Sequence, residues 1–239
     1  MAERPPHAAP PPALVRAMFD DIVGRYDLVN GLLSLGLDRR WRRAAVTAVD
    51  PAAGELILDI GTGTGDVARL VRRRGARVVG VDLSHDMLVV AGAKVPSGAT
   101  FAEASVFALP FGEGSFDAGV SAFVLRNLND LPAAFGELAR VVRPGGRVAL
   151  VDITEPERPA ILRVFDAYFG VAAPALGRLV GKADAYRYLV RSLAQLPPHS
   201  EVCRLLEGSG FRQARARPLT GGMVTLFTAT RSTSRAEGE

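Results

Sequence analysis

The sequence predicts an α/β fold, in which a mostly parallel sheet carries helices on both faces and ends in an antiparallel hairpin. Three observations support this prediction. Apolar strand-like runs alternate with amphipathic stretches, a glycine-rich turn follows the first run, and two strand-like segments close the chain. Such alternation is typical of parallel sheets, because each helix returns the chain to the same edge of the sheet.

The expected elements can be placed in order along the chain. Short apolar runs predict parallel strands over residues 55–60, 77–82, 100–104, 116–123 and 147–153. A helix is predicted between the last two strands, because apolar residues recur there at helical spacing: Leu131, Phe135, Leu138 and Val142. Asp130 should cap this helix, and Pro144-Gly145-Gly146 should end it.

The end of the chain departs from the strand-helix rhythm. Strands are predicted over residues 211–219 and 223–230, and Thr220-Gly221-Gly222 should join them as an antiparallel hairpin. With 239 residues, the chain is long enough for one sizeable domain with additions. We expect a disordered leader over residues 1–12, which are rich in proline, one domain over 13–231 and a flexible tail over 232–239. Within the domain, residues 13–50 should form an N-terminal helical cap, and residues from about 156 to 200 a helical insertion.

Composition limits the classes of function. The single cysteine, Cys203, excludes an intrachain disulfide and a multi-cysteine metal site, and no metal site is expected. The sequence has no apolar run of about 18 residues and no export signal, so a cytoplasmic protein is expected. The formal net charge of +4 comes almost wholly from arginine. Arginines flank Trp41 and could attract anionic lipid, but no recognised nucleic-acid module accompanies them.

The run Leu58-Asp59-Ile60-Gly61-Thr62-Gly63-Thr64-Gly65-Asp66 predicts a nucleotide site, with a glycine-rich turn over residues 61–65. Glycine lets a ligand approach the main chain, and a helix starting near Thr64 would add unpaired N–H groups. The glycines alone leave two cofactors open. Asp66 stands where a dinucleotide motif starting at Gly61 needs its third glycine, whereas a motif starting at Gly63 ends at the permitted Ala68.

Two carboxylates bear on the choice of cofactor. Asp59 precedes the turn, where it would repel a pyrophosphate but suit a cationic amino-acid group such as that of S-adenosylmethionine. Asp82 ends the second predicted strand, 17 residues after Gly65, near the spacing of a ribose-binding carboxylate. Asp82 could instead cap the next helix, a role that Ser84 could also fill.

Several motifs in order resemble the ubiquinone/menaquinone-biosynthesis C-methyltransferases, a family of class I S-adenosylmethionine-dependent enzymes. The more specific motifs are Tyr26-Asp27-Leu28-Val29-Asn30, Leu125-Arg126-Asn127 and Tyr186-Arg187-Tyr188-Leu189. The resemblance covers residues 18 to about 227. It implies a Rossmann-like sheet, S-adenosylmethionine as cofactor, and ring C-methylation of a prenylated demethylmenaquinol-like substrate in menaquinone or ubiquinone biosynthesis.

The resemblance also implies residue roles at the cofactor. Thr64 and Asp82 should contact S-adenosylmethionine, over a floor formed by Asp59, Gly61, Gly63 and Gly65. Ser105 and Val106 stand where the family places an Asn-Ala pair beside the adenine, and Ala122 aligns with a family serine. Tyr26 could close over the cofactor, although a place in the core is an equally good interpretation.

Residues at the acceptor follow from the same resemblance and from chemistry. Arg126 is the candidate for stabilising a phenolate-like ring oxygen, with Asn127 as its hydrogen-bonding neighbour. A purely structural interpretation pairs Arg126 with a local carboxylate such as Asp130. Tyr186 and Tyr188 could line the acceptor pocket, but packing in the core explains them as well.

Other functions stay open. The first alternative is a related C-, O- or N-methyltransferase of secondary metabolism, which the departures at Ser105 and Ala122 keep open. A non-catalytic cofactor-binding protein and a dinucleotide oxidoreductase are further alternatives. The expected partner is a small prenylated quinol, with no nucleic acid. Peripheral contact with the inner face of the membrane remains a hypothesis, and the oligomeric state is not predicted.

Overall fold

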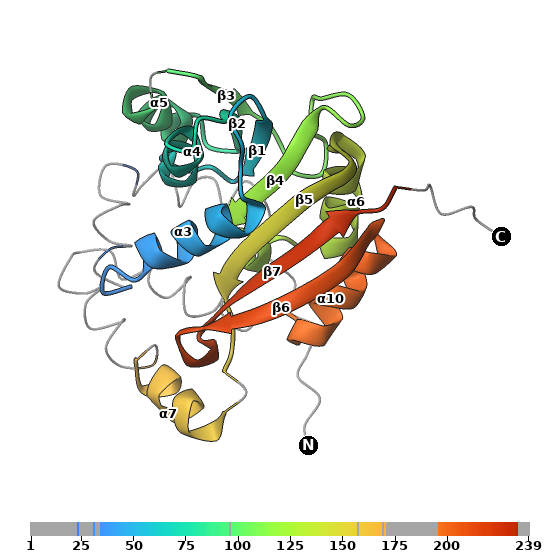
Figure 1. Ribbon diagram of the computed structural model, residues 1–239. Coiled ribbons are helices and arrows are strands. Elements are labelled where there is room, and N and C mark those ends of the chain that lie inside the picture. Colours follow the sequence, from blue (N-terminus) through green and yellow to red (C-terminus); the bar gives the residue numbers. More distant parts are fainter. Residues whose placement is uncertain are drawn as a thin grey trace.

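A seven-stranded sheet organises the protein in the order β3-β2-β1-β4-β5-β7-β6 (Figure 1). The computed structural model describes residues 23, 31, 34–95, 97–156, 158–168, 170 and 196–233. Its strands are β1 (Leu56–Ile60), β2 (Arg77–Asp82), β3 (Ala99–Glu103), β4 (Phe116–Ala122), β5 (Val142–Ile153), β6 (Phe211–Leu219) and β7 (Val224–Arg231). Each predicted strand is therefore confirmed, with shifts of at most one residue at its ends except at the start of β5.

The strand pairing contains a topological switch point. Strands β1 to β5 are parallel, while β7 pairs antiparallel with both β5 and β6, as the terminal hairpin predicted. From β1 the chain winds outward through β2 to β3 and then returns to the other side of β1 as β4. In open α/β sheets, ligands bind outside the carboxyl ends of the strands at such a point.

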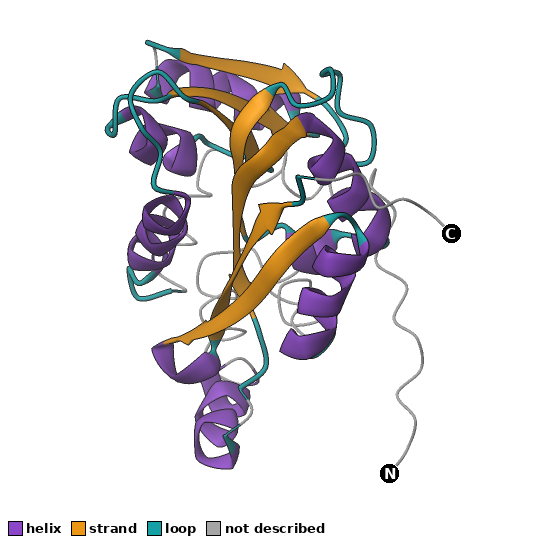
Figure 2. Ribbon diagram, turned by 45° about the vertical axis from the view of Figure 1, so that its right-hand side comes forward, coloured by secondary structure: helices purple, strands orange, loops and turns teal. Residues whose placement is uncertain are grey.

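Helices cover both faces of the sheet (Figure 2). On one face, α3 (Asp38–Val49) and α4 (Asp66–Arg72) bury their apolar residues against β1, β2, β4 and β5. On the other face, α6 (Leu131–Val141) and α10 (His199–Gly208) pack over Leu58, Leu150 and Phe227. A further helix, α5 (His85–Lys94), packs against β2 and β3.

The end of α6 corrects one expectation. Asp130 does cap this helix, because its Oδ1 accepts a hydrogen bond from the Ala133 N–H at 2.9 Å. The helix ends at Val141, however, before the predicted Pro-Gly-Gly stop. Val142 is extended and pairs with Phe116, so β5 begins five residues earlier than the predicted strand at Arg147. Pairing with β4, which the local spacing does not reveal, decides this boundary.

The additions to the sheet are described only in part. Helix α3 belongs to the expected N-terminal cap, and α7 (Pro159–Ala167) to the expected insertion. Helix α7 lies near the short turn η5 (Thr220–Gly222), where a Cβ on Gly221 would come within 2.8 Å of the Ile161 Cδ1. None of the described helices combines the length and apolar character needed to cross a bilayer.

Candidate functional site

The glycine-rich turn lies at the switch point, between the carboxyl ends of β1 and β4. All three glycines adopt positive φ angles: 60° at Gly61, 53° at Gly63 and 80° at Gly65. A Cβ on Gly61 would lie 2.1 Å from the Val124 Cγ2, in the segment that follows β4. Both backbone angle and close packing therefore require glycine at position 61. Helix α4 starts at Asp66, two residues later than expected, with Gly65 as its N-cap.

Asp82 holds the turn in place. Its Oδ2 accepts a hydrogen bond from the Gly63 N–H at 2.8 Å, and its Oδ1 accepts one from the Ser84 N–H at 3.0 Å. Ser84 is the N-cap of α5, because its Oγ accepts a hydrogen bond from the Met87 N–H at 3.2 Å. Asp82 is therefore not the cap of that helix. Its half-buried carboxylate lies beside the turn, where a ribose-binding group was expected.

Asp59 is a carboxylate with no exposed surface at the end of β1. The Thr62 hydroxyl donates to its Oδ2 at 2.6 Å, but no donor in the described part of the chain lies in hydrogen-bond geometry at Oδ1. Burial raises the pKa of Asp59 to about 7, although the Thr62 hydroxyl and the Ala68 N–H favour the ionised form. A buried acceptor without a partner is costly, so this site fits a ligand that carries a positive group.

Thr64 is buried and lies beside two charged side chains. The Lys94 Nζ donates to its Oγ1 at 3.3 Å and forms an ion pair with the Asp66 Oδ1 at 2.6 Å. Lys94 therefore links the end of α5 to the glycine-rich turn and to the first residue of α4.

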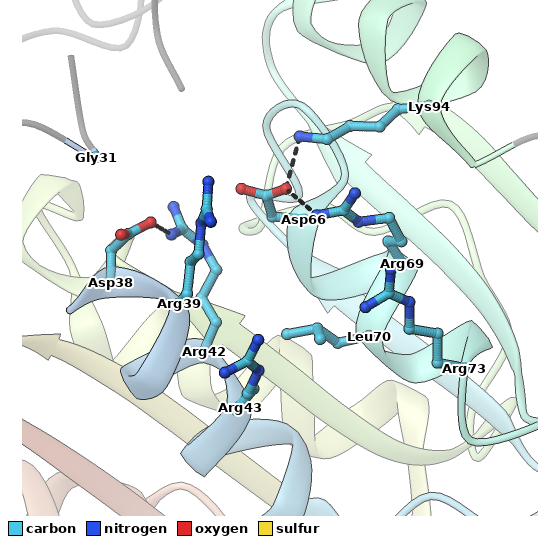
Figure 3. A pocket seen from close by; sticks show the side chains of 10 residues that line it. All are labelled: Gly31, Asp38, Arg39, Arg42, Arg43, Asp66, Arg69, Leu70, Arg73 and Lys94. Carbon is cyan, nitrogen blue, oxygen red and sulfur yellow. Dashed lines mark hydrogen bonds and ion pairs between the residues drawn. The ribbon is translucent and has the colours of Figure 1, made fainter. Parts of the chain in front are cut away.

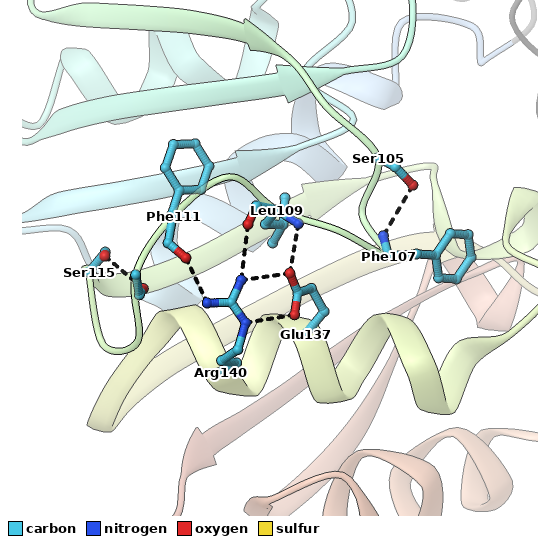
Figure 4. A network of polar contacts seen from close by, with 8 residues as sticks. Ser105, Phe107, Leu109, Phe111, Ser115, Glu137 and Arg140 are labelled. Atoms are coloured by element: carbon cyan, nitrogen blue, oxygen red, sulfur yellow. Dashed lines mark hydrogen bonds and ion pairs between the residues drawn. The ribbon is translucent and has the colours of Figure 1, made fainter.

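Ser105 and Val106 follow β3, in a loop that α6 anchors. The Ser105 Oγ accepts a hydrogen bond from the Phe107 N–H at 3.2 Å, so this hydroxyl shapes its own turn. Figure 4 shows how two side chains of α6 hold the rest of the loop. Arg140 donates to the carbonyls of Phe111 at 2.6 Å and Leu109 at 3.0 Å, while Glu137 accepts from the Leu109 N–H at 2.6 Å.

Arg126 lies in the 3₁₀ turn η2 (Leu125–Asn127), directly after β4, and only 8% of it is exposed. Its Nη1 bonds the Asp152 Oδ1 at 2.5 Å, and its backbone N–H donates to Oδ2 at 3.1 Å. Asp152 is fully buried near the end of β5. The Arg126 Nε is buried and has no partner among the residues that the structure describes. The local carboxylate is therefore Asp152 and not Asp130, and one edge of the guanidinium retains a donor.

Phe123 connects the two faces of the site. This residue follows β4 with a φ of 68°, a left-handed conformation that is rare for a bulky side chain. The Arg42 guanidinium lies 5.1 Å from the centre of its ring, and that of Arg126 lies 5.9 Å from it. Nothing in the sequence signalled Phe123. Asp152 did carry a signal, because a charged residue inside an apolar strand is seldom buried without a partner.

Other expected residues are placed less directly. The Asn127 Nδ2 donates to the Phe123 carbonyl at 3.5 Å, where a bond to Arg126 was expected. Ser121, next to Ala122, donates to the Ile60 carbonyl at 2.8 Å and so ties β4 to β1. Tyr26, Tyr186 and Tyr188 lie outside the described residues. Within residues 34–95, 97–156 and 196–233, no cluster of three His, Cys, Asp or Glu side chains could hold a metal ion.

Comparisons with known proteins show which family the chain is similar to. The model of the ubiE/COQ5 methyltransferase family matches residues 10–231. A ubiquinone/menaquinone biosynthesis C-methyltransferase, UbiE, of Syntrophotalea carbinolica is 42% identical over 222 residues, 91% of this chain and 94% of the relative. A demethylmenaquinone methyltransferase of Thermus thermophilus is 41% identical over 220 residues, 90% of this chain and 100% of the relative.

Solved structures show the same fold. The crystal structure of a SAM-dependent methyltransferase from Aquifex aeolicus has a TM-score of 0.60 and 18% sequence identity. The similarity covers 92% of this chain and 98% of that chain. At this level of identity the likeness concerns the fold alone, because one fold can carry many different activities.

Proposed function

Because the chain belongs to the ubiE/COQ5 methyltransferase family, we propose that it methylates a ring carbon of a prenylated demethylmenaquinol-like substrate in quinone biosynthesis. The methyl donor in this proposal is S-adenosylmethionine. One observation carries the proposal: a buried arginine with an unpartnered donor, Arg126, lies next to the glycine-rich turn at the switch point between β1 and β4. Donor and acceptor sites would thus meet at one edge of the sheet.

The residues of the turn support the choice of donor. The unpartnered Asp59 Oδ1 suits a cationic amino-acid group, and the glycine at position 63 is fixed by Asp82. Asp82 would bind the ribose hydroxyls with its remaining acceptor capacity, and Thr64, Ser105 and Val106 would border the cofactor. When bound, S-adenosylmethionine supplies a methyl group activated by its sulfonium charge.

The proposed reaction does not require the protein to form a covalent intermediate with either substrate. The ring carbon would accept the methyl group as the carbon–sulfur bond breaks, leaving S-adenosylhomocysteine, and would then lose its proton to a base or to water, which restores aromaticity. Electron density reaches this carbon from the ring hydroxyl as its proton is lost or shared. The Arg126 Nε would donate a hydrogen bond to the ring oxygen and stabilise its negative charge, while Asp152 holds the guanidinium in position.

An acceptor panel tests this proposal. We expect the purified protein with S-adenosylmethionine to add one methyl group to reduced demethylmenaquinones, as measured by mass spectrometry, and to leave the oxidised quinones unchanged. The difference follows because only the reduced ring carries the hydroxyl that supplies electron density. Turnover of oxidised and reduced forms alike would contradict the mechanism. Methylation of a different acceptor class alone would favour a methyltransferase of secondary metabolism.

We further propose peripheral contact with the membrane, because a prenylated acceptor resides in the bilayer. The positive net charge and Leu35, which is 74% exposed in the turn before α3, support such contact. We expect the protein to sediment with anionic vesicles at low salt and less so at high salt, since screening weakens the attraction of exposed charges. Absence of binding to anionic vesicles at low salt would rule the contact out.

A further inference from the structure

A cationic pocket lies between α3 and α4, beside the glycine-rich turn (Figure 3). Its volume is about 250 Å³. Six basic and two acidic side chains line it: Arg39, Arg42, Arg43, Arg69, Arg73 and Lys94, with Asp38 and Asp66. The residues predicted to bind the nucleoside do not explain what this pocket does.

The acidic side chains in the pocket are already paired. Asp38 forms a salt bridge with Arg42, and Asp66 pairs with Lys94 at 2.6 Å and with Arg69 at 3.5 Å. By contrast, the side chain of Arg39 has no ion pair or hydrogen bond with any residue that the structure describes, and it is exposed. The pocket therefore holds uncompensated positive charge and suits an anionic group.

Arg42 is held in a fixed orientation. Its Nη1 bonds Asp38, which also accepts a hydrogen bond from the Ser34 hydroxyl at 2.9 Å, and its guanidinium lies over the Phe123 ring. Nε and Nη2 have no partner among the described residues, so the other edge of the planar group remains available. A guanidinium fixed in this way matches the geometry of a carboxylate.

The position of the pocket relates it to the proposed cofactor. Asp66 directly follows the glycine-rich turn, and Figure 3 shows Arg39 and Arg42 reaching from α3 toward this first residue of α4. Arg42 is also close enough to Asp59 to favour its ionised form. An anionic group in the pocket would thus lie near the buried Asp59 carboxylate, whose Oδ1 suits a positive group. A ligand that fits both places would carry a positive group at Asp59 and a negative group in the pocket, a short distance apart. The α-amino and α-carboxylate groups of an amino acid have this arrangement.

We propose that Arg39 and Arg42 bind the carboxylate at the amino-acid end of the cofactor. This inference rests on the proposed function, because it takes S-adenosylmethionine as the ligand. Arg42 supplies the fixed donor edge, and Arg39 supplies a positive charge that no carboxylate among the described residues neutralises. The nucleoside end is bound separately, at the turn and at Asp82.

Two ligands separate this role from general effects on the site. S-adenosylhomocysteine carries the amino acid, and 5′-methylthioadenosine is a nucleoside thioether that lacks it. By calorimetry, we expect Arg39→Gln and Arg42→Gln each to weaken binding of S-adenosylhomocysteine by about 10- to 100-fold, the range for a hydrogen bond to a charged group. Binding of 5′-methylthioadenosine should change less than about twofold, because it has no carboxylate.

The control is Arg40→Gln, which removes an exposed arginine of the same helix that does not line the pocket. This variant should bind both ligands as the wild type does. Because Arg42 is buried and paired, its variant could unfold, and the exposed Arg39 then carries the test. Equal losses of affinity for the two ligands, or no loss of affinity, would overturn the assignment of these arginines to the carboxylate. Neither result would contradict the proposal that S-adenosylmethionine is the cofactor. A wild type that binds neither ligand would overturn the proposed function itself.

Discussion

Replacing Asp59 by asparagine is expected to make the ligand-free protein more stable at pH 8. The carboxylate is buried, and its pKa rises from 3.8 to about 7 on folding. Between pH 3.8 and about pH 7, the folded state therefore keeps a proton on Asp59 that the unfolded state has released. The free energy of unfolding falls as the pH rises through this window. Above pH 7 both states are ionised, and the cost reaches about 4 kcal/mol at most. Asparagine carries no such cost.

Urea unfolding of the two proteins at pH 8 and pH 5 measures this effect. We expect the variant to be more stable by roughly 1 to 4 kcal/mol at pH 8, and the gap to narrow by roughly 2 to 3 kcal/mol at pH 5. Removal of the charge should also weaken binding of S-adenosylhomocysteine, by about 10-fold or more, because the ammonium group loses its partner. If the variant were less stable than the wild type at both pH values, Asp59 would not be a buried charge that destabilises the ligand-free protein and serves to bind the ligand.

Replacing Arg126 by lysine is expected to lower kcat by about 100- to 1,000-fold, the usual loss when one donor to a developing oxyanion is removed. Lysine keeps the positive charge but cannot bond Asp152 and a ring oxygen at the same time through a planar group. The affinity for S-adenosylhomocysteine should change little, because Arg126 is not among the residues proposed to bind the cofactor. Steady-state kinetics and calorimetry separate these two effects.

A matched control is available in Arg143, which pairs with Asp117 at 2.7 Å but is half exposed. Arg143→Lys should leave both kcat and stability almost unchanged, since exposed ion pairs contribute little. Loss of one partner from the buried Arg126–Asp152 pair costs about 3–5 kcal/mol in comparable cases, so the variant must be assayed below its unfolding temperature. An unchanged kcat in folded Arg126→Lys would exclude the arginine from the reaction.

Much of the fold could be predicted from local patterns. Apolar runs located the five parallel strands, and two strand-like segments joined by Thr220-Gly221-Gly222 located the terminal hairpin. Asp130 and Ser84 act as caps because their side chains satisfy N–H groups of the first helical turn, a purely local interaction. The boundary at Val142 could not be predicted, because a pairing with Phe116 across the sheet decides it.

The candidate site divides in the same way. Asp59 and the glycines lie in one short segment at the end of β1, and Asp82 ends the neighbouring strand β2. Residue type and spacing in the sequence were therefore enough to predict them as site residues. The partner of Arg126 lies 26 residues away, on β5, and depends on how β4 and β5 align. The left-handed conformation of Phe123 arises where β4 meets the turn, and no residue preference indicates it. The pocket at Arg39 and Arg42 requires the packing of α3 beside α4.

The position of the transferred methyl group tests the central claim most directly. The protein is incubated with reduced demethylmenaquinone and S-adenosylmethionine that carries ¹³C in its methyl group, and the product is analysed by NMR. We predict that the labelled methyl is bonded to the unsubstituted carbon of the quinone ring, with loss of the proton from that carbon. A label on oxygen, or no labelled quinol under conditions in which the protein binds S-adenosylhomocysteine, would contradict the account.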